Sequence, residues 1–141
     1  MSSNPISVNP FLRRVLWADA IVSAAVGVLM ALGAGVLQRL LGLPPALLEV
    51  AGVALLPYAA YLVWLAGRAA VPRVAVWAPI VLNLVWAIDC LLLFAAGLRP
   101  TLLGEAFIVL HIVTVLAFAE LEFIGLRRAL SLPRAARTQP T

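Results

Sequence analysis

Four long apolar segments, separated by short connectors rich in glycine, proline or arginine, dominate the pattern of the chain. The segments cover residues 15–37, 47–66, 74–98 and 102–126. Each is long enough to cross about 30 Å of hydrocarbon as a helix, since an α-helix rises about 1.5 Å per residue. The pattern therefore predicts an all-α fold: a polytopic membrane protein whose four transmembrane helices form an antiparallel bundle.

The remaining residues divide into two tails around this transmembrane domain, which covers residues 15–126. Residues 1–14 form an N-terminal tail. Its first ten residues are polar and contain two prolines, so we expect them to be disordered or to lie on the surface, and residues 11–14 lead into the first span. Residues 127–141 form a basic C-terminal tail. The first apolar segment is longer than the apolar region of a typical secretory signal peptide, and we therefore interpret it as a membrane span.

Composition supports a membrane location and changes the list of expected partners. Of the 141 residues, 65% are hydrophobic and 11% are charged, and the mean hydropathy is +1.10. A soluble domain of this size cannot bury so much apolar surface. All basic residues are arginines that flank the apolar segments, which predicts contact with acidic lipid headgroups and no nucleic-acid partner. Cys90 is the only cysteine, which excludes an intrachain disulfide and a multi-cysteine metal site.

The positions of the arginines predict how the chain crosses the membrane. Eight of the ten lie in the N-terminal segment, the 67–73 connector or the C-terminal tail, and the other two connectors hold Arg39 and Arg99. Positive charge is retained in short cytoplasmic segments. We therefore expect a multi-pass protein of the bacterial inner (cytoplasmic) membrane with both termini in the cytoplasm.

One pair of polar residues is expected to meet between the third and fourth spans. Asp89 and His111 are each eleven residues from Pro100, so they lie at the same depth in an antiparallel hairpin. We expect a hydrogen bond between them, which either joins the helices or belongs to a proton relay or substrate site. A metal site is the weakest alternative, because a single histidine suits neither di-iron nor bis-histidine haem ligation, and we expect no metal and no cofactor.

A second polar layer is expected near the arginine-rich side. Asp19 is five residues from Arg14, Glu122 is five residues from Arg127, and Glu120 lies slightly deeper. Salt bridges to arginines that reach back along the helices are the simpler interpretation. If two of these acids converge without an arginine, one is expected to hold a proton at neutral pH, as in a proton-coupled carrier.

Two further features concern the packing of the helices. Pro57 frees the carbonyl of Val53, and Asn83 lies at matching depth, where we expect it to satisfy that carbonyl. The first span also carries a ridge of small residues at four-residue intervals, against which another helix can pack closely. The members of this helix-packing ridge are Ser23, Gly27, Ala31 and Gly35.

Several short stretches taken together resemble a known group of proteins. They are Phe11-Leu-Arg-Arg, Leu16-Trp-Ala-Asp-Ala20, the Gly42-Leu-Pro-Pro turn, a Pro-Tyr pair in the second span, and Ala119-Glu-Leu-Glu122 before Gly-Leu-Arg-Arg. In this order they resemble small uncharacterised four-helix integral membrane proteins of bacteria, a resemblance that implies no activity. The chain departs from the small multidrug resistance transporters, because Asp19 lies near one end of its span instead of the middle.

These observations lead to an ordered set of functional expectations. The first is a non-enzymatic accessory or oligomeric membrane component, surrounded by lipid and associated with further copies or with a larger complex. The alternative is a proton-coupled transporter of a small hydrophobic or cationic compound that uses Asp19, Asp89, His111 and Glu120. Glu122 and Asn83 complete the set of candidate polar residues. A membrane enzyme acting on a lipid or quinone is third, because no extramembrane segment is large enough for a catalytic domain.

Overall fold

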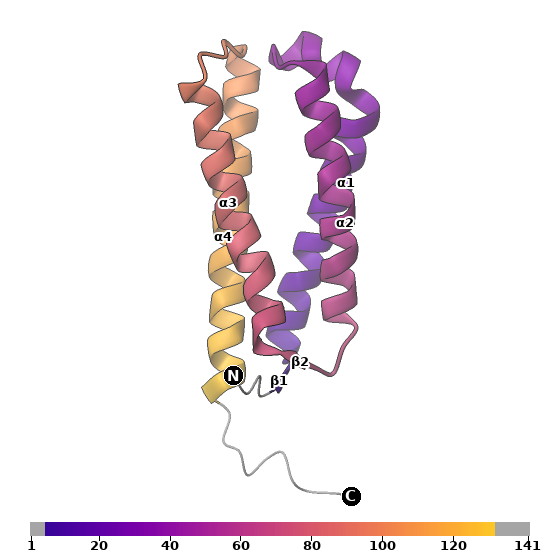
Figure 1. The fold of residues 1–141 in the computed structure, drawn as a ribbon, viewed down its shortest axis with the longest axis vertical. Coiled ribbons are helices and arrows are strands. Elements are labelled where there is room, and N and C mark those ends of the chain that lie inside the picture. Colours follow the sequence, from indigo (N-terminus) through magenta and orange to yellow (C-terminus); the bar gives the residue numbers. More distant parts are fainter. Residues whose placement is uncertain (1–4, 132–141) are drawn as a thin grey trace, which may run out of the picture.

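The computed structural model describes residues 5–131, in which four helices run up and down in an antiparallel bundle (Figure 1). The helices are α1 Pro10–Leu41, α2 Pro45–Ala66, α3 Arg73–Ala95 and α4 Leu102–Ser131. Each is long and apolar enough to span a membrane, which confirms the predicted four-span, all-α fold. The part of the expected basic tail that contains Arg134 and Arg137 lies outside the described residues.

Helix α1 extends beyond the predicted span at both ends because local signals define its limits. The Asn9 side chain caps the N-terminus by accepting a hydrogen bond of 2.8 Å from the Leu12 amide, and Pro10 occupies the first turn. At the other end Gly42 adopts a left-handed conformation, with φ of 68°, and its amide bonds to the Gln38 carbonyl. The resulting 32 residues are about 48 Å long, so α1 exceeds the hydrocarbon thickness.

The four helices are packed as two hairpins that meet along one side. Helix α1 packs extensively against α2, and α3 packs against α4. The hairpins are joined mainly between α1 and α4, whereas α2 and α3 barely touch. Figure 1 shows a gap between the α1–α2 pair and the α3–α4 pair in the half of the bundle near the 42–44 and 96–101 connectors, here called the turn end. The hairpins meet again at the connectors, where Thr101 donates hydrogen bonds to the Leu41 carbonyl at 2.9 Å and to the Leu40 carbonyl at 2.6 Å.

The small-residue ridge forms part of the α1–α2 contact. A Cβ atom on Gly27 would lie 2.9 Å from the Gly52 carbonyl oxygen, and one on Gly52 would lie 2.5 Å from the Ala31 amide nitrogen. The ridge prediction is wrong for Gly35, which is exposed and has no atom near its Cβ position. Positions four residues apart advance about 40° around a helix, so Gly35 is rotated about 120° from Ser23.

The opposite end of the bundle is closed by a short sheet that the sequence analysis did not predict. Strand β1 Pro5–Ser7 pairs antiparallel with β2 Ala70–Pro72, with Ile6 opposite Val71. The expectation that residues 1–10 are disordered or lie on the surface is therefore wrong from residue 5 onward, because Ile6 and Val8 are buried and α1 begins at Pro10. Strands of three residues, each with a proline, are too short to give an alternating pattern. We call this two-stranded element the strap, and this end of the bundle the strap end.

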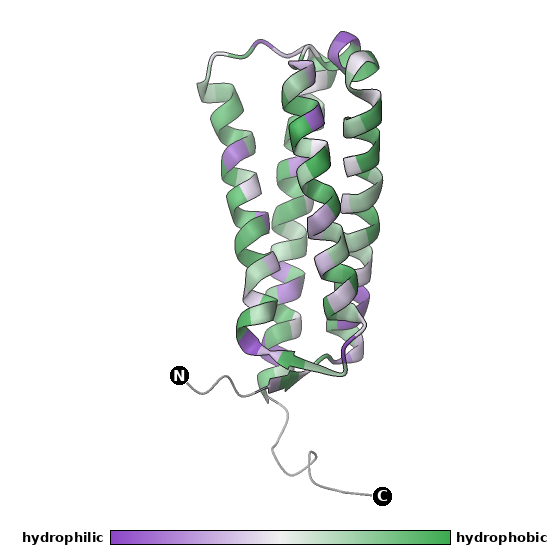
Figure 2. Cartoon of the chain, turned by 45° about the vertical axis from the view of Figure 1, so that its right-hand side comes forward, coloured by the Kyte–Doolittle hydropathy of each residue, from purple (hydrophilic) through white to green (hydrophobic). Residues whose placement is uncertain are grey.

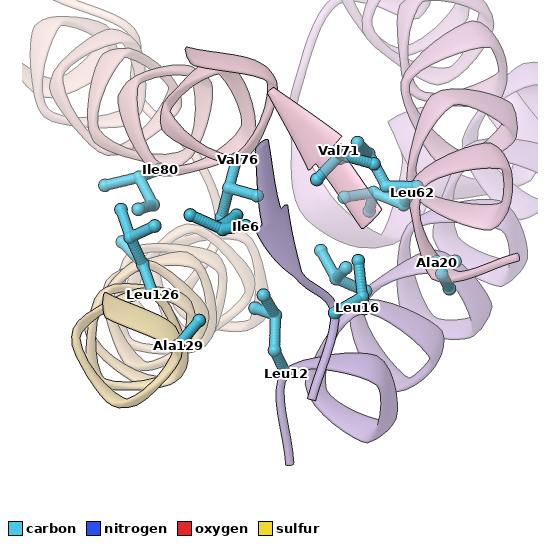
Figure 3. Close-up of a cluster of buried hydrophobic side chains, with 14 residues drawn as sticks. Ile6, Leu12, Leu16, Ala20, Leu62, Val71, Val76, Ile80, Leu126 and Ala129 are labelled. Carbon is cyan, nitrogen blue, oxygen red and sulfur yellow. The ribbon is translucent and has the colours of Figure 1, made fainter. Parts of the chain in front are cut away.

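A compact apolar core holds the strap against the helices (Figure 3). Ile6 is 2% exposed and lies among side chains from three helices and from β2. The labelled neighbours from α1, α3 and α4 include Leu12, Val76 and Leu126, all almost completely buried. The Asn9 side-chain amide also donates to the Gly125 carbonyl at 3.0 Å, which connects the start of α1 to α4. The strap end is therefore sealed by side-chain packing.

The outer surface of the bundle is suited to lipid. Figure 2 shows apolar residues along most of each helix, with polar residues at the helix ends and at a few positions between them. Large apolar side chains are exposed on the helices, among them Leu32 at 86% and Leu102 at 83%. Such surface is stable only where hydrocarbon replaces water.

Candidate functional site

Five polar side chains from all four helices meet in the interior of the bundle. They are Asp19 and Ser23 on α1, Tyr58 on α2, Asn83 on α3 and Glu122 on α4. Asp19 and Glu122 are 1% and 0% exposed. We call this group the carboxyl cluster. Within it the Asn83 side chain of α3 donates hydrogen bonds to Asp19 of α1 and to Glu122 of α4, and so joins three helices.

The two carboxyl groups have very different hydrogen-bond environments. Asp19 accepts three bonds: Oδ1 from the Ser23 hydroxyl at 2.8 Å, and Oδ2 from the Tyr58 hydroxyl at 2.8 Å and the Asn83 amide at 3.1 Å. Glu122 Oε2 accepts only a long bond of 3.4 Å from the same Asn83 amide. Glu122 Oε1 is buried without a hydrogen-bond partner among residues 5–131. Three donors suit an ionised carboxylate, whereas an unpartnered oxygen does not.

The expected salt bridges to arginine are not what stabilises this layer. Within the described part of the chain, every hydrogen-bond partner of Asp19 and Glu122 is uncharged. Two of the arginines at the strap end lie over aromatic rings instead: Arg68 is 5.0 Å from the centre of Trp64 and Arg128 is 4.3 Å from that of Phe11. The cluster therefore combines two buried acids without a compensating cation.

Asn83 has a different role from the predicted one. It was expected to satisfy the Val53 carbonyl that Pro57 frees, but its amide donates to the two carboxyl groups. Hydrogen bonds to a charged acceptor are stronger than those to a neutral carbonyl, which accounts for this choice. The matching depth was nevertheless informative, because Tyr58, next to Pro57, belongs to the same cluster.

Glu120 does not belong to the cluster, although it was a candidate. It is exposed on the outer surface of α4, two residues before the buried Glu122. Residues two apart in a helix point about 200° from each other, so only one of the two acids can face the interior. Glu120 therefore provides a matched reference for experiments on Glu122.

Asp89 and His111 lie in the opening between the two hairpins, but the expected hydrogen bond between them is replaced by another. His111 Nδ1 bonds to the Phe107 carbonyl of its own helix at 3.0 Å. Asp89 is exposed, and no side-chain hydrogen bond involves it among residues 5–131. Both residues nevertheless line the same cavity of about 310 Å³. An unpaired acid at this depth costs about 2.5–3.5 kcal/mol on insertion scales.

Three cavities that share lining residues lie between this opening and the carboxyl cluster. The first contains Asp89 and His111, the second, of about 470 Å³, reaches Tyr58 and Asn83, and the third, of about 190 Å³, reaches Asp19. Trp86 lines all three. We call the three together the cleft. The cleft therefore places open space beside Asp19, Tyr58 and Asn83 of the cluster.

The sequence analysis assigned two members of the cluster to other roles. Ser23 was interpreted only as a packing residue, although its four-residue spacing from Asp19 places both on one helix face. Tyr58 follows a proline inside an apolar segment, and nothing in the local pattern identifies its partner. No three histidine, cysteine, aspartate or glutamate side chains come together as a metal site within residues 5–131.

Comparison of the chain with protein-family models, with curated proteins and with solved structures gave no match. The geometry of the cluster and the cleft is therefore the basis for a functional assignment.

Proposed function

We propose that this polytopic membrane protein is a non-enzymatic carrier that couples movement of a small molecule to a proton held by Asp19 and Glu122. One observation supports this most directly: two buried carboxyl groups share a single amide donor, and no basic side chain of residues 5–131 hydrogen-bonds to either. Two negative charges buried next to each other and away from water are costly in free energy. A single proton removes one of them.

The hydrogen-bond pattern indicates which acid carries the proton. Asp19 accepts three donors and is the natural site of the charge, whereas Glu122 Oε1 has a vacant acceptor position. Protonation turns one Glu122 oxygen into a donor and removes the negative charge, so the carboxyl group no longer needs several hydrogen-bond donors around it. The groups that face these acids from the other helices, Tyr58 and Asn83, are neutral.

The position of the cleft supports a carrier rather than a fixed structural cluster. The strap joins the hairpins at one end and Thr101 joins them at the other, whereas the cleft lies between α2 and α3 and reaches the cluster from the side. A carrier must expose its coupling site to one side at a time. A rocking of the two hairpins about their α1–α4 contact provides a way to do this.

Infrared spectroscopy of the full chain in lipid tests the proton assignment. We expect the C=O absorption of a protonated carboxylic acid at pH 7, with a shift in D₂O. The band is expected to disappear in Glu122→Gln and to remain in Glu120→Gln, the exposed acid two residues away. A band that survives Glu122→Gln unchanged would contradict the proposal.

The orientation is proposed from the arginines, as in the sequence analysis: the strap end, with Arg13, Arg68 and Arg128, faces the cytoplasm of a bacterial inner membrane. In a Cys90→Ala background, a cysteine at the exposed Gly97 is expected to react with a membrane-impermeant maleimide in intact cells. A cysteine at the exposed Ala69 is expected to react only after lysis. The reverse labelling would contradict this orientation.

A second candidate is the accessory or oligomeric component. The weak contact between α2 and α3 favours it, because a second copy can complete the bundle there against exposed side chains such as Val50 and Leu82. It predicts a stable dimer after mild solubilisation and no infrared band that depends on Glu122. A monomer that carries the band removes this candidate.

A further inference from the structure

We propose that the cleft binds a protonated amphiphilic amine, with the ammonium group between Asp89 and His111 and the apolar chain along the cavities. This inference names the cargo class of the proposed carrier and so rests on that function. The carboxyl cluster and the ammonium site are separate groups of residues, so each can be tested without the other.

Asp89 supplies the charge that such a ligand requires. It lies within α3, lines two of the three cavities, and is exposed to them. No arginine side chain is among the residues that line these cavities. A carboxylate at this depth is stabilised by a cation that enters from the membrane. Charge complementarity therefore selects a cation over an anion or a neutral lipid.

His111 limits the choice of cation to one that can donate hydrogen bonds. Its Nδ1 bonds to a backbone carbonyl, which can only accept, so the ring proton is on Nδ1. The Phe107 ring, whose centre is 4.3 Å from that of His111, helps to fix the imidazole. In the neutral imidazole Nε2 is then an acceptor, and the His111 side chain lines the cavity that contains Asp89. Two acceptors suit an ammonium with N–H groups better than a quaternary ammonium, which has none.

The remaining walls of the first cavity suit an apolar chain. Met30, Leu48, Leu93 and Ile108 come from four different helices and line it together with Trp86. The volumes of about 310 and 470 Å³ are within the range of small-molecule sites. The face of Trp86 also attracts a cation. The weak α2–α3 contact leaves a lateral entrance through which an amphiphile can enter from lipid.

Binding can be measured with Trp86 as a reporter in the full chain. Trp17, Trp64 and Trp77 are replaced by phenylalanine, and the protein is placed in nanodiscs of phosphatidylcholine. We expect octylammonium to change Trp86 fluorescence in a saturable way at pH 7. Asp89→Asn is expected to raise the apparent Kd at least tenfold, whereas Glu49→Gln, an exposed acid outside the cavities, leaves it unchanged.

Two ligand controls test the role of the histidine. Octyltrimethylammonium is expected to bind more weakly than octylammonium. His111→Ala is expected to weaken the binding of octylammonium and to leave the binding of octyltrimethylammonium unchanged. Octanol, which has no charge, is expected to show no dependence on Asp89. Equal binding of octylammonium to Asp89→Asn and Glu49→Gln, or the absence of saturation, would overturn the inference.

Failure of this inference is distinguishable from failure of the proposed function. If the Glu122-dependent infrared band is present but octylammonium does not bind, the carrier has another cargo and the ammonium site is wrong. If octylammonium binds through Asp89 while the band is absent, the cleft is a binding site without proton coupling.

Discussion

Replacing Gly52 with leucine is expected to prevent α1 and α2 from packing and to leave little folded protein. A Cβ atom at this position would lie 2.5 Å from the Ala31 amide nitrogen and 2.7 Å from the Gly27 carbonyl oxygen. These are backbone atoms of a regular helix, so they cannot move aside as a flexible side chain can. Overpacking of an interior costs about 1–3 kcal/mol, and we expect leucine to exceed this range.

Gly35→Leu is the matched control, because the Cβ position of Gly35 has open space around it. Both variants add the same side chain to a helical glycine, so differences in helix propensity cancel. The free energy of unfolding can be compared by titrating detergent-solubilised protein with SDS and following tryptophan fluorescence. Equal stability of the two variants would show that the close α1–α2 contact does not contribute to the fold.

Asn83→Leu is expected to give the second large effect, a destabilisation of about 3 kcal/mol at neutral pH. The substitution preserves side-chain size but removes the donor that serves both Asp19 and Glu122. Removal of one partner from a buried ionic network commonly costs about 3–5 kcal/mol. The loss of unfolding free energy is expected to become smaller as the pH falls, because protonation of both carboxyl groups removes the negative charge that the Asn83 amide stabilises.

The same SDS titration, carried out at neutral and at acid pH, measures this effect. Leu84→Ala is the control, since Leu84 is the next residue on α3 and is exposed at 43%. If Asn83→Leu lowers the free energy of unfolding by no more than Leu84→Ala does, and by the same amount at both pH values, Asn83 does not stabilise the two acids. Asn83→Asp would add a third carboxyl group, and we expect it to fold only at low pH.

The sequence predicted the depth of the polar residues better than their direction. Counting from flanking arginines placed Asp19 and Glu122 at one level, and they do meet through Asn83. The same counting included Glu120, which faces outward. In a soluble helix the polar face would identify the exposed side, but in lipid both faces of the helix are apolar. The pattern therefore does not distinguish the two glutamates.

The sequence by itself determined that this chain forms four apolar helices, because length and hydropathy alone decide whether a segment can cross a bilayer with its backbone hydrogen bonds satisfied. The tertiary structure decided which polar groups share the interior, and it separated the hairpins along α2 and α3. It also closed the strap end with Ile6 and Val71. These outcomes depend on the rotation of each helix about its axis and on contacts between distant residues, which leave no periodic signal in the chain.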